Sequence, residues 1–410
     1  MTDAASPAMS RPLVPQGTPI VGIVGGGQLA RMCAGPATEL GLGVVVLAES
    51  ADAAAAQVYA HAPVGRADDL ERLQELARVC DVVTFDHEHV PGELLAVLES
   101  EGVALHPAPS ALLHAQDKLV MRRALGEAGL PVPRWGEVTS RAELEEFAGG
   151  EWPVVLKTPR GGYDGKGVMV VTGADDLGRA EEWFDRAGGE PLLAEEAVAF
   201  GRELAVLVAR NPSGEVRSWP VVHTVQEQGI CTRVEAPAPE LDPDLARDVR
   251  QAAEQLAVDL GVTGVMAVEI FETGTPAEGD RGWVVNELAM RPHNSGHWTQ
   301  DGAVTDQFEQ HLRAVLDLPL GDTSPRAAHT VMANVLGGSA EDLHAASRRV
   351  MAQDAGARLH LYGKEVRPGR KVGHVTVTGE DLDGLRRRAT IARGLLEGTD
   401  DAPTTEGDTP

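Results

Sequence analysis

The sequence predicts a protein that joins an α/β domain to α+β segments, and two features of the chain indicate this. In the N-terminal part, short apolar runs alternate with helical patterns, which is the rhythm of a parallel sheet with crossover helices. From about residue 113 this rhythm gives way to paired strand-like runs and separate helices, as in α+β lobes. A chain of 410 residues has room for two to four domains of roughly 100 to 200 residues each.

The elements of the N-terminal part follow from this alternation. We expect strands over Ile20–Val24, Val44–Leu47 and Val82–Phe85, because each is a short apolar run bounded by turn residues. The apolar spacing predicts helices over Leu29–Leu40 and Asp69–Val79. Together these elements predict a parallel sheet.

The next part begins with helix signals. A helix is expected over Asp117–Ala128, because Gly129 and Pro131 stop it, and Ser140 with Glu143 fits a capping box that opens another. The remaining expected elements are strands over Val154–Thr158 and Val168–Thr172, β-rich runs over 192–235, a helix over 241–260, strands over 264–272 and 282–288, and a mixed segment over 325–396.

Composition limits the classes of function. The 36 basic and 62 acidic residues give a formal charge of −26, which argues against a nucleic-acid or anionic-membrane surface. An anionic ligand must therefore be held by a local cationic cluster. The three cysteines are scattered and odd in number, which indicates a reducing compartment without a structural metal cage. With no secretory signal pattern and only short apolar runs, we expect a cytoplasmic protein that does not span a membrane.

The first segment that could carry chemistry is Gly25-Gly26-Gly27-Gln28-Leu29-Ala30, which follows an apolar strand and opens a helix. Glycines there let a ligand approach the backbone, and free N–H groups at the helix start favour an anion. With Glu49 at the end of the second strand, the pattern resembles a dinucleotide fingerprint. A tight turn, or a turn for another ligand, explains the same residues.

The second segment is Lys157-Thr-Pro-Arg160-Gly161-Gly162-Tyr163-Asp164-Gly165-Lys166-Gly167, which lies between two expected strands. Its glycines suit a hairpin whose amides fold over phosphates. It is not a Walker A loop, because position 160 is Arg and position 167 is Gly. The alternative is a solvent loop.

The third segment is a pair of strands that each carry carboxylates within an apolar run. Glu269 lies in the first, and Asn286 and Glu287 lie in the second. A buried carboxylate is costly unless it is paired or bound to metal. If the strands are neighbours, these oxygens suit Mg²⁺. If they are edge residues, the carboxylates face solvent.

Two further segments are rich in hydrogen-bond donors. Arg291-Pro-His293-Asn294-Ser295-Gly296-His297-Trp298-Thr299 suits a small anion such as bicarbonate or phosphate, whereas a zinc site is disfavoured by Gly296 and by the absence of a third ligand nearby. In 362–374, Pro368-Gly369 forces a turn that gathers Lys364, Arg367, Arg370 and Lys371, which favours a phosphate site over a solvated face.

Taken together, these segments in this order resemble the 5-(carboxyamino)imidazole ribonucleotide synthase family of ATP-grasp enzymes, over about residues 19–395. The resemblance rests on four motifs: 27–32, 161–167, 286–299 and 367–374. It implies an ATP-grasp fold with a Rossmann-like N-terminal domain (19–112), a small lobe with a glycine-rich lid (113–190), a large lobe (191–322) and a small C-terminal domain for the substrate phosphate (323–396). The tails over 1–18 and 397–410 lie outside this resemblance, and their composition predicts disorder.

The resemblance also implies roles for individual residues. ATP is expected at Lys118, Lys157, Gly162, Tyr163, Asp164, Gly165, Lys166, Gly167, Glu195, Glu196, Ala197, Val198, Glu203, Gln226, Asn286 and Glu287. Magnesium, as one or two ions, is expected at Glu269 and Glu287. The aminoimidazole ribonucleotide is expected at Gln28, Leu29, Glu88, His293, Lys364, Arg367, Arg370 and Lys371. The catalytic group is expected to be Asp164, Lys166, Arg291 and Asn294. Gln226 and Lys166 depart from residues found in some family members, which carry His and Arg there.

The implied reaction is the ATP- and bicarbonate-dependent carboxylation of the exocyclic amine of 5-aminoimidazole ribonucleotide through carboxyphosphate, in purine biosynthesis, by a homodimer. The alternatives are another ATP-grasp ligase, such as the formate-dependent glycinamide ribonucleotide transformylase, a nicotinamide oxidoreductase built on the first glycine turn, and a non-catalytic nucleotide-binding regulator.

Overall fold

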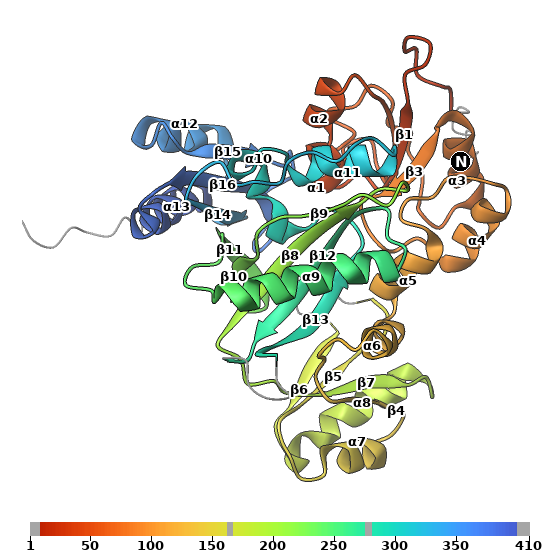
Figure 1. The fold of residues 1–410 in the computed structure, drawn as a ribbon, viewed down its shortest axis with the longest axis vertical. Coiled ribbons are helices and arrows are strands. Elements are labelled where there is room, and N and C mark those ends of the chain that lie inside the picture. Colours follow the sequence, from red (N-terminus) through yellow and green to blue (C-terminus); the bar gives the residue numbers. More distant parts are fainter. Residues whose placement is uncertain (1–8, 162–166, 275–280, 400–410) are drawn as a thin grey trace, which may run out of the picture.

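The computed structural model describes residues 9–161, 167–274 and 281–399, which form three sheets with helices packed on them (Figure 1). No helix in these three ranges is both long and apolar enough to cross a membrane. Residues 162–166, which belong to the predicted glycine-rich hairpin, lie outside the described residues, as does most of the expected C-terminal tail.

The N-terminal sheet is parallel, as predicted. Its order is β2 (Gly43–Leu47), β1 (Ile20–Val24), β3 (Val82–Phe85), and every residue of the three strands is buried. Such continuous apolar strands occur where helices cover both faces of a sheet. The helices of this part are α1 (Gln28–Met32), α2 (Ala34–Glu39), α3 (Leu70–Val79), α4 (Gly92–Ser100) and α5 (Pro109–Gln116).

The prediction of one helix over 29–40 is wrong in one respect, because the structure has two helices there, α1 and α2, which meet at Cys33. Pro36 explains the break. Proline has no N–H to donate to the carbonyl of Met32, four residues earlier, and its ring would clash with that carbonyl. The predicted tail over 1–18 is also described in part: Arg11 forms an ion pair of 3.2 Å with Asp81 at the start of the N-terminal domain.

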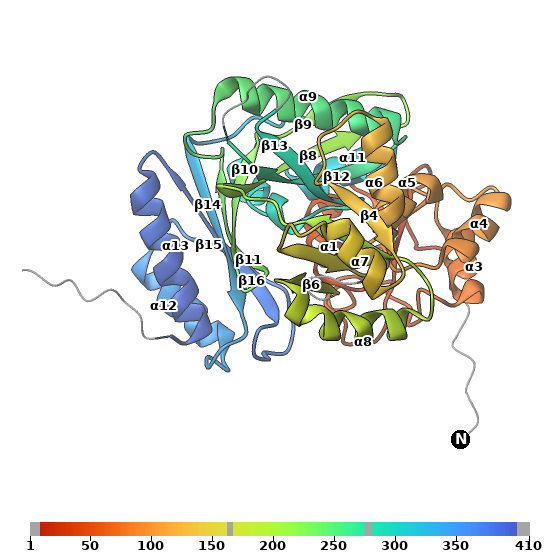
Figure 2. The same ribbon diagram turned by 90° about the horizontal axis from the view of Figure 1, so that it is seen from below.

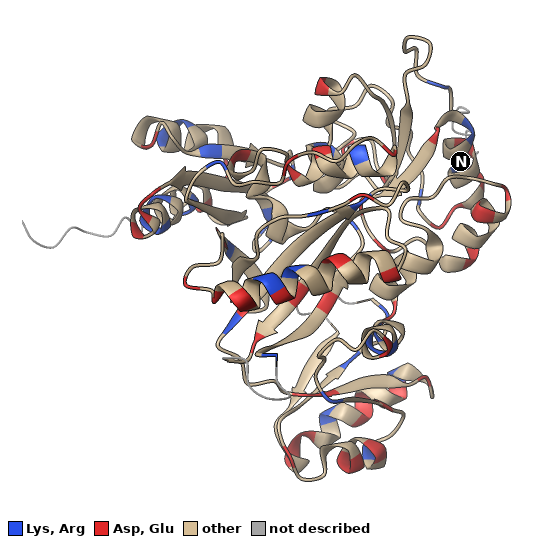
Figure 3. Cartoon of the chain, in the orientation of Figure 1, with Lys and Arg blue, Asp and Glu red and all other residues tan. Residues whose placement is uncertain are grey.

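The small lobe is a four-stranded sheet of order β4-β7-β5-β6, with two helices on one face (Figures 1 and 2). Leu144 and Leu177 of these helices are fully buried against the strands. The same two helices are rich in acidic residues (Figure 3). The bounds are α6 (Lys118–Glu127), which leads into the lobe, β4 (Trp135–Val138), α7 (Arg141–Ala148), β5 (Val154–Lys157), β6 (Val168–Val171), α8 (Leu177–Ala187) and β7 (Leu192–Glu196).

The large sheet runs β13-β12-β8-β10-β11-β14-β16-β15, with β9 paired to β8. Alternate residues of β8 face opposite sides: Leu204 and Val206 pack in the cluster that includes α9, whereas Ala205 and Leu207 pack with part of α11. The bounds are β8 (Arg202–Arg210), β9 (Val216–Ser218), β10 (Val222–Glu227), β11 (Ile230–Ala236), α9 (Pro243–Asp259), β12 (Gly264–Glu272), β13 (Trp283–Ala289), α10 (Thr299–Gly302) and α11 (Gln307–Val315).

The C-terminal segment extends this same sheet. Its strand β14 (His329–Leu336) pairs antiparallel with β11, with Val234 opposite Met332, so the hydrogen-bonded ladder continues across residue 323. The other elements are α12 (Leu343–Gln353), β15 (Arg358–Leu361), β16 (Lys371–Gly379) and α13 (Leu382–Glu397).

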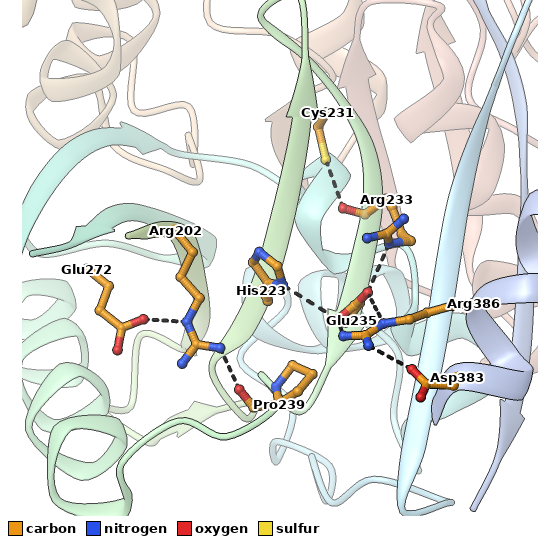
Figure 4. Close-up of polar contacts among 9 residues, drawn as sticks. All are labelled: Arg202, His223, Cys231, Arg233, Glu235, Pro239, Glu272, Asp383 and Arg386. Carbon is orange, nitrogen blue, oxygen red and sulfur yellow. Dashed lines mark hydrogen bonds and ion pairs between the residues drawn. The ribbon is translucent and has the colours of Figure 1, made fainter. Parts of the chain in front are cut away.

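A buried charge cluster fastens α13 to this sheet (Figure 4). Glu235 on β11 is completely buried, and both of its oxygens accept hydrogen bonds from Arg386 on α13, at 2.8 and 2.7 Å. Arg233 donates to the same carboxylate at 2.9 Å, and His223 lies 3.5 Å from it. The C-terminal segment is thus joined to the large lobe by strand pairing and by ion pairs of the buried Glu235 with partly exposed arginines.

Candidate active site

One cavity of about 1640 Å³ brings most of the predicted site residues together. It is bordered by the first glycine turn, the small lobe, the large sheet and the turn before β16. The predicted residues that line it are Gln28, Leu29, Glu88, Lys118, Lys157, Glu195, Glu196, Ala197, Val198, Glu203, Gln226, Glu269, Asn286, Glu287, Arg291, His293, Asn294, Lys364, Arg367, Arg370 and Lys371.

The predicted hairpin borders the cavity through its ends. Gly161 and Val168 line the cavity, while Gly167 does not and closes the base of the hairpin by accepting a hydrogen bond of 3.0 Å from the Thr158 amide. The other hairpin residues with a predicted role lie outside the described residues: Gly162, Tyr163, Asp164, Gly165 and Lys166.

The two carboxylates predicted for magnesium are direct neighbours on adjacent strands. Glu269 of β12 lies opposite Glu287 of β13, and the register shifts there, so that Asn286 is an extra residue in β13. A bulge of this kind re-aims side chains and is frequent next to active sites. Here Asn286 and Glu287, although consecutive, both line the cavity. Both carboxylates therefore line the cavity, although β13 is the last strand of the sheet and the Glu287 side chain is 43% exposed.

Each carboxylate already has a partner in the cavity wall. The Lys118 ammonium lies 3.0 Å from Glu287, and the Nε2 atom of His293 lies 3.1 Å from Glu269. Burial alone would raise the pKa of Glu269, but the His293 hydrogen bond and nearby cations outweigh it, so this pKa lies below its ordinary value. The site therefore holds Glu269 as an anion.

A buried chain of charges positions Lys157. Its ammonium lies 2.7 Å from Glu195, which is 2% exposed and also pairs with the fully buried Arg122. Arg122 further donates to the carbonyls of Val285 at 3.2 Å and Asn286 at 2.7 Å, which are the bulge residue and the residue before it. Arg122 thus connects α6, the small lobe and β13. It carries no recognisable motif, and sequence analysis missed it.

The first glycine turn is occupied by the protein's own carboxylates. Asp86 accepts hydrogen bonds from the amides of Gly27 at 3.0 Å and Ala30 at 2.7 Å, and Glu49 accepts one from Gly26 at 3.1 Å. A side chain at position 27 would collide with Asp86. The glycines therefore make room for Asp86 rather than for a pyrophosphate, which disfavours the dinucleotide interpretation.

The opposite end of the cavity carries the cations of the C-terminal turn. Lys364 donates to the side chain of Gln28, which links this turn to the first glycine turn. Arg291 pairs with Glu88 at 2.7 Å. Burial alone would raise the pKa of Glu88, but Arg291 outweighs it and holds this pKa below its usual value. His87, which sequence analysis also missed, lines the same wall.

A second acidic site lies on β8. Burial and the neighbouring charge of Glu269 raise the pKa of Glu203 to about 7, although a hydrogen bond from Gln226 opposes this. Glu203 and Gln226 therefore act as one hydrogen-bonded unit in the cavity wall. This contact shows that the glutamine at position 226, which departs from the family pattern, faces the cavity.

Comparison with known proteins gives the same family as the resemblance. The family model of the ribonucleotide synthetase preATP-grasp domain matches residues 19–116, that of the ATP-grasp domain matches 123–308, and that of the phosphoribosylaminoimidazole carboxylase C-terminal domain matches 330–388. These three matches together span most of the chain.

Named relatives and solved structures agree. The N5-carboxyaminoimidazole ribonucleotide synthase of Mycobacterium tuberculosis is 51% identical over 384 residues, which are 92% of this chain and 88% of that protein. The Corynebacterium ammoniagenes enzyme is 48% identical, and the match covers 93% of this chain and 92% of that protein. The fold matches the Thermus thermophilus synthetase with a TM-score of 0.81 at 37% identity, covering 92% and 98%. It matches the Aspergillus clavatus synthase, in complex with ADP and 5-aminoimidazole ribonucleotide, with a TM-score of 0.83 at 33% identity. This match covers 93% of this chain and 99% of that one.

These findings confirm the predicted fold class and the resemblance drawn from the four motifs. The nicotinamide oxidoreductase and regulator interpretations are not supported. The chain therefore belongs to the N5-carboxyaminoimidazole ribonucleotide synthase family of ATP-grasp enzymes, and it is an ATP-dependent ligase.

Proposed function

We propose that this chain carboxylates the exocyclic amine of 5-aminoimidazole ribonucleotide with bicarbonate, at the expense of ATP. The observation that supports the proposal is that one cavity has two distinct ends. Carboxylates and a lysine on β12, β13 and β5 line one end, and the cations of 364–371 line the other. The first end suits a triphosphate and the second suits a ribonucleotide phosphate. Between them lie donors for a small anion.

For the ATP end, we propose that Lys118 and Lys157 bind phosphate oxygens and that Glu196, Ala197 and Val198 border the base. The donor set fits Mg²⁺, because Glu269, Glu287 and Asn286 present carboxylate and amide oxygens on adjacent strands. When bound, magnesium would offset the negative charge of the phosphates. Lys118 and His293, which pair with these carboxylates in the structure, would then be available to contact substrates.

For the ribonucleotide end, we propose contacts from Gln28, Leu29 and Glu88 to the aminoimidazole nucleoside. Lys364, Arg367, Arg370 and Lys371 then surround its phosphate. Four cations at one turn favour a dianionic phosphate, although the Glu365 carboxylate, 2.6 Å from Arg367, offsets part of their charge. The turn geometry that gathers them depends on Gly369, which has φ of +74°.

The reaction has two steps. A bicarbonate oxygen attacks the γ-phosphorus of ATP, the bond to the β-phosphate oxygen breaks, and carboxyphosphate and ADP form. The amine of the ribonucleotide then forms a C–N bond with the carboxyl carbon, phosphate leaves and the amine loses a proton. We propose that Arg291 and Asn294 hold the bicarbonate-derived group. Asp164 and Lys166 remain predicted participants, and full turnover of Asp164→Asn with an unchanged pH profile would remove Asp164 from this role.

The test is phosphate release from MgATP, with the ribonucleotide and bicarbonate omitted in turn. We expect release to fall to background when either is absent. Formate in place of bicarbonate should not restore it. Phosphate release with formate and glycinamide ribonucleotide, in place of bicarbonate and the aminoimidazole ribonucleotide, would favour the glycinamide ribonucleotide transformylase alternative. The homodimer and the cytoplasmic location stay predictions.

A further inference from the structure

His297 lines the cavity, and one of its two ring nitrogens has no hydrogen-bond partner among the described residues. The residue is completely buried. Its ring stacks on His374 with centroids 5.0 Å apart and lies 5.7 Å from the Phe308 ring. Its Nδ1 atom is 2.8 Å from the side-chain nitrogen of Gln307. The remaining polar atom, Nε2, is buried and without a hydrogen-bond partner in the described part of the chain, yet His297 lines the cavity.

The contacts of Gln307 decide which nitrogen of His297 carries the proton. The Gln307 oxygen accepts from the His293 amide at 2.8 Å, and its nitrogen donates to the His293 carbonyl at 2.9 Å. The amide orientation is therefore fixed by backbone groups. Because the Gln307 nitrogen is a donor, Nδ1 of His297 must accept, and a neutral imidazole then holds its proton on Nε2.

The neutral state follows from the surroundings. Burial lowers the pKa of His297 well below its ordinary value, and the charges of His293, Lys371 and Arg291 lower it further. The Nε2–H group is therefore a donor held in a positively charged region. A buried donor without a partner is costly, so it needs a ligand or a water.

Asn294 supplies a second, independent observation on the same wall. Its amide oxygen is buried and lacks a hydrogen-bond partner in the described ranges. Its amide nitrogen is buried too and interacts with the Cys231 thiol, which itself points to the Arg233 carbonyl at 3.7 Å (Figure 4), so one of the two amide N–H groups stays available to a ligand. The wall thus offers two donors and one acceptor.

We propose that the Nε2–H of His297 and the side-chain amide of Asn294 together bind bicarbonate, and that the Asn294 oxygen selects for its hydroxyl group. This rests on the proposed function and names a ligand-binding residue of that site. Bicarbonate presents two acceptor oxygens and one O–H donor, which matches the wall. Formate and a fully ionised phosphate have no O–H group, so they leave the Asn294 oxygen unpaired, and discrimination follows from that penalty.

Two substitutions at position 297 separate this role from a structural one. In His297→Asn, the side-chain oxygen can still accept from Gln307 but nothing occupies the place of Nε2. In His297→Gln, the amide nitrogen reaches the place of Nε2 but the acceptor for Gln307 is lost. If His297 binds bicarbonate, His297→Asn raises the KM for bicarbonate about 10-fold to 100-fold. His297→Gln should stay within about threefold of the wild type. The KM for ATP and for the ribonucleotide should change less than about twofold in both.

The opposite order, with His297→Gln impaired and His297→Asn normal, would mean that the histidine only anchors Gln307. Equal effects on all three KM values would also overturn the proposal. Thermal unfolding and ADP binding check that each variant folds.

If His297→Asn does not fold, ¹⁵N-histidine NMR of the wild type replaces it: we expect one Nε2–H resonance to shift on addition of bicarbonate and not of formate, and no shift would contradict the proposal. Wild-type protein that releases no phosphate with all substrates present would instead contradict the proposed function itself.

Discussion

Arg122 is a fully buried cation whose contacts reach three parts of the active site. It holds Glu195, which in turn holds Lys157, and it binds the carbonyls of Val285 and Asn286 beside the magnesium carboxylates. Because these contacts span both lobes, we expect Arg122 to set the distance between the lysines of the small lobe and the carboxylates of β13. It acts through other residues and is a positioning residue.

Replacement of Arg122 should therefore affect stability and turnover together. Arg122→Met leaves buried acceptors unpaired, and we expect a loss of about 3 to 5 kcal/mol in the free energy of unfolding. We also expect a lower kcat, with Arg122→Lys restoring part of it. The matched control is Arg123→Met, since Arg123 is half-exposed and pairs with the surface residue Glu137, so its loss of stability should be much smaller. Urea unfolding and initial rates measure both effects, and equal losses in the two variants would contradict the account.

Glu203 gives a pH dependence with a definite sign. Its pKa is raised to about 7 in the folded protein from 4.5, so the folded state binds more protons between these values. Its contribution to stability is complete below pH 4.5 and is lost as the pH rises through 7.

The unfolding free energy of the neutral variant Glu203→Gln, measured relative to the wild type, should therefore be more favourable at pH 8 than at pH 5. We expect this change to be about 1 to 2 kcal/mol. Urea midpoints at the two pH values measure this difference. The control Glu196→Gln removes a half-exposed carboxylate that lines the same cavity, and we expect a smaller difference between the two pH values. A Glu203→Gln effect that is the same at both pH values would mean that this carboxyl does not titrate near 7.

Several of these residue contacts could not be predicted from the sequence. The pair Glu269 and Glu287 was found because carboxylates in apolar strands are conspicuous, but which face they take depends on the bulge at Asn286, and strand alternation cannot predict a bulge. Asp86 was missed because its partners, the Gly27 and Ala30 amides, lie more than fifty residues away in the chain. Arg122 was missed for the same reason.

Among the elements, helix α6 delivers Lys118 to the cavity, and its N-cap fixes where the helix starts. Asp117 accepts from the amides of Leu119 at 3.0 Å and Val120 at 3.2 Å, and it also pairs with Arg160 at 2.9 Å, at the base of the glycine-rich hairpin. A single carboxylate thus fixes the start of the helix and one end of the hairpin.

Asp117→Ala should cost about 1 to 2 kcal/mol in unfolding free energy through the lost cap. It should also raise the KM for ATP severalfold, because Lys118 and Arg160 lose their alignment. Asp242→Ala removes an equivalent N-cap, with bonds of 2.9 and 3.0 Å, from α9, and Asp242 does not line the main cavity. This control should lose similar stability without a change in KM. An unchanged KM in Asp117→Ala would show that the cap has no part in ATP binding.

Element boundaries were predictable where local chemistry decides them. The predicted helix at 117–128 and strands at 20–24 and 82–85 agree with α6, β1 and β3 to within a residue. The break between α1 and α2 was not predicted. The apolar spacing over 29–40 indicated one continuous helix, and Pro36, which divides it, was given less weight than that spacing.

Across the whole molecule, the C-terminal segment and the large lobe share one sheet, so they should unfold as one unit. The β11–β14 ladder and the Glu235–Arg386 pair both cross the boundary near residue 323 (Figure 4). The family resemblance implied a separate small domain over 323–396. Strand pairing between segments about one hundred residues apart has no local signal.

Glu235→Gln tests this connection. The substitution removes the charge that pairs with the partly exposed Arg233 and Arg386, and we expect a loss of about 1.5 to 3 kcal/mol at pH 7, the range for hydrogen bonds to charged groups. Burial would raise the pKa of Glu235, but His223, Arg386 and Arg233 outweigh it and hold this pKa well below 4.5. The stability it contributes is therefore present above pH 4.5 and is lost as the pH falls below that value. The difference in unfolding free energy between the wild type and Glu235→Gln, measured with urea, should shrink from pH 7 to pH 3. A constant difference would mean that the Glu235 charge does not stabilise the attachment of α13.

The central claim is that one cavity holds ATP, bicarbonate and the ribonucleotide so that bicarbonate oxygen attacks the γ-phosphorus. The most direct measurement follows ¹⁸O from labelled bicarbonate into the phosphate released in the presence of MgATP and 5-aminoimidazole ribonucleotide. The account predicts that each phosphate carries one oxygen from bicarbonate. Phosphate that carries no label while the ribonucleotide is still carboxylated would contradict it.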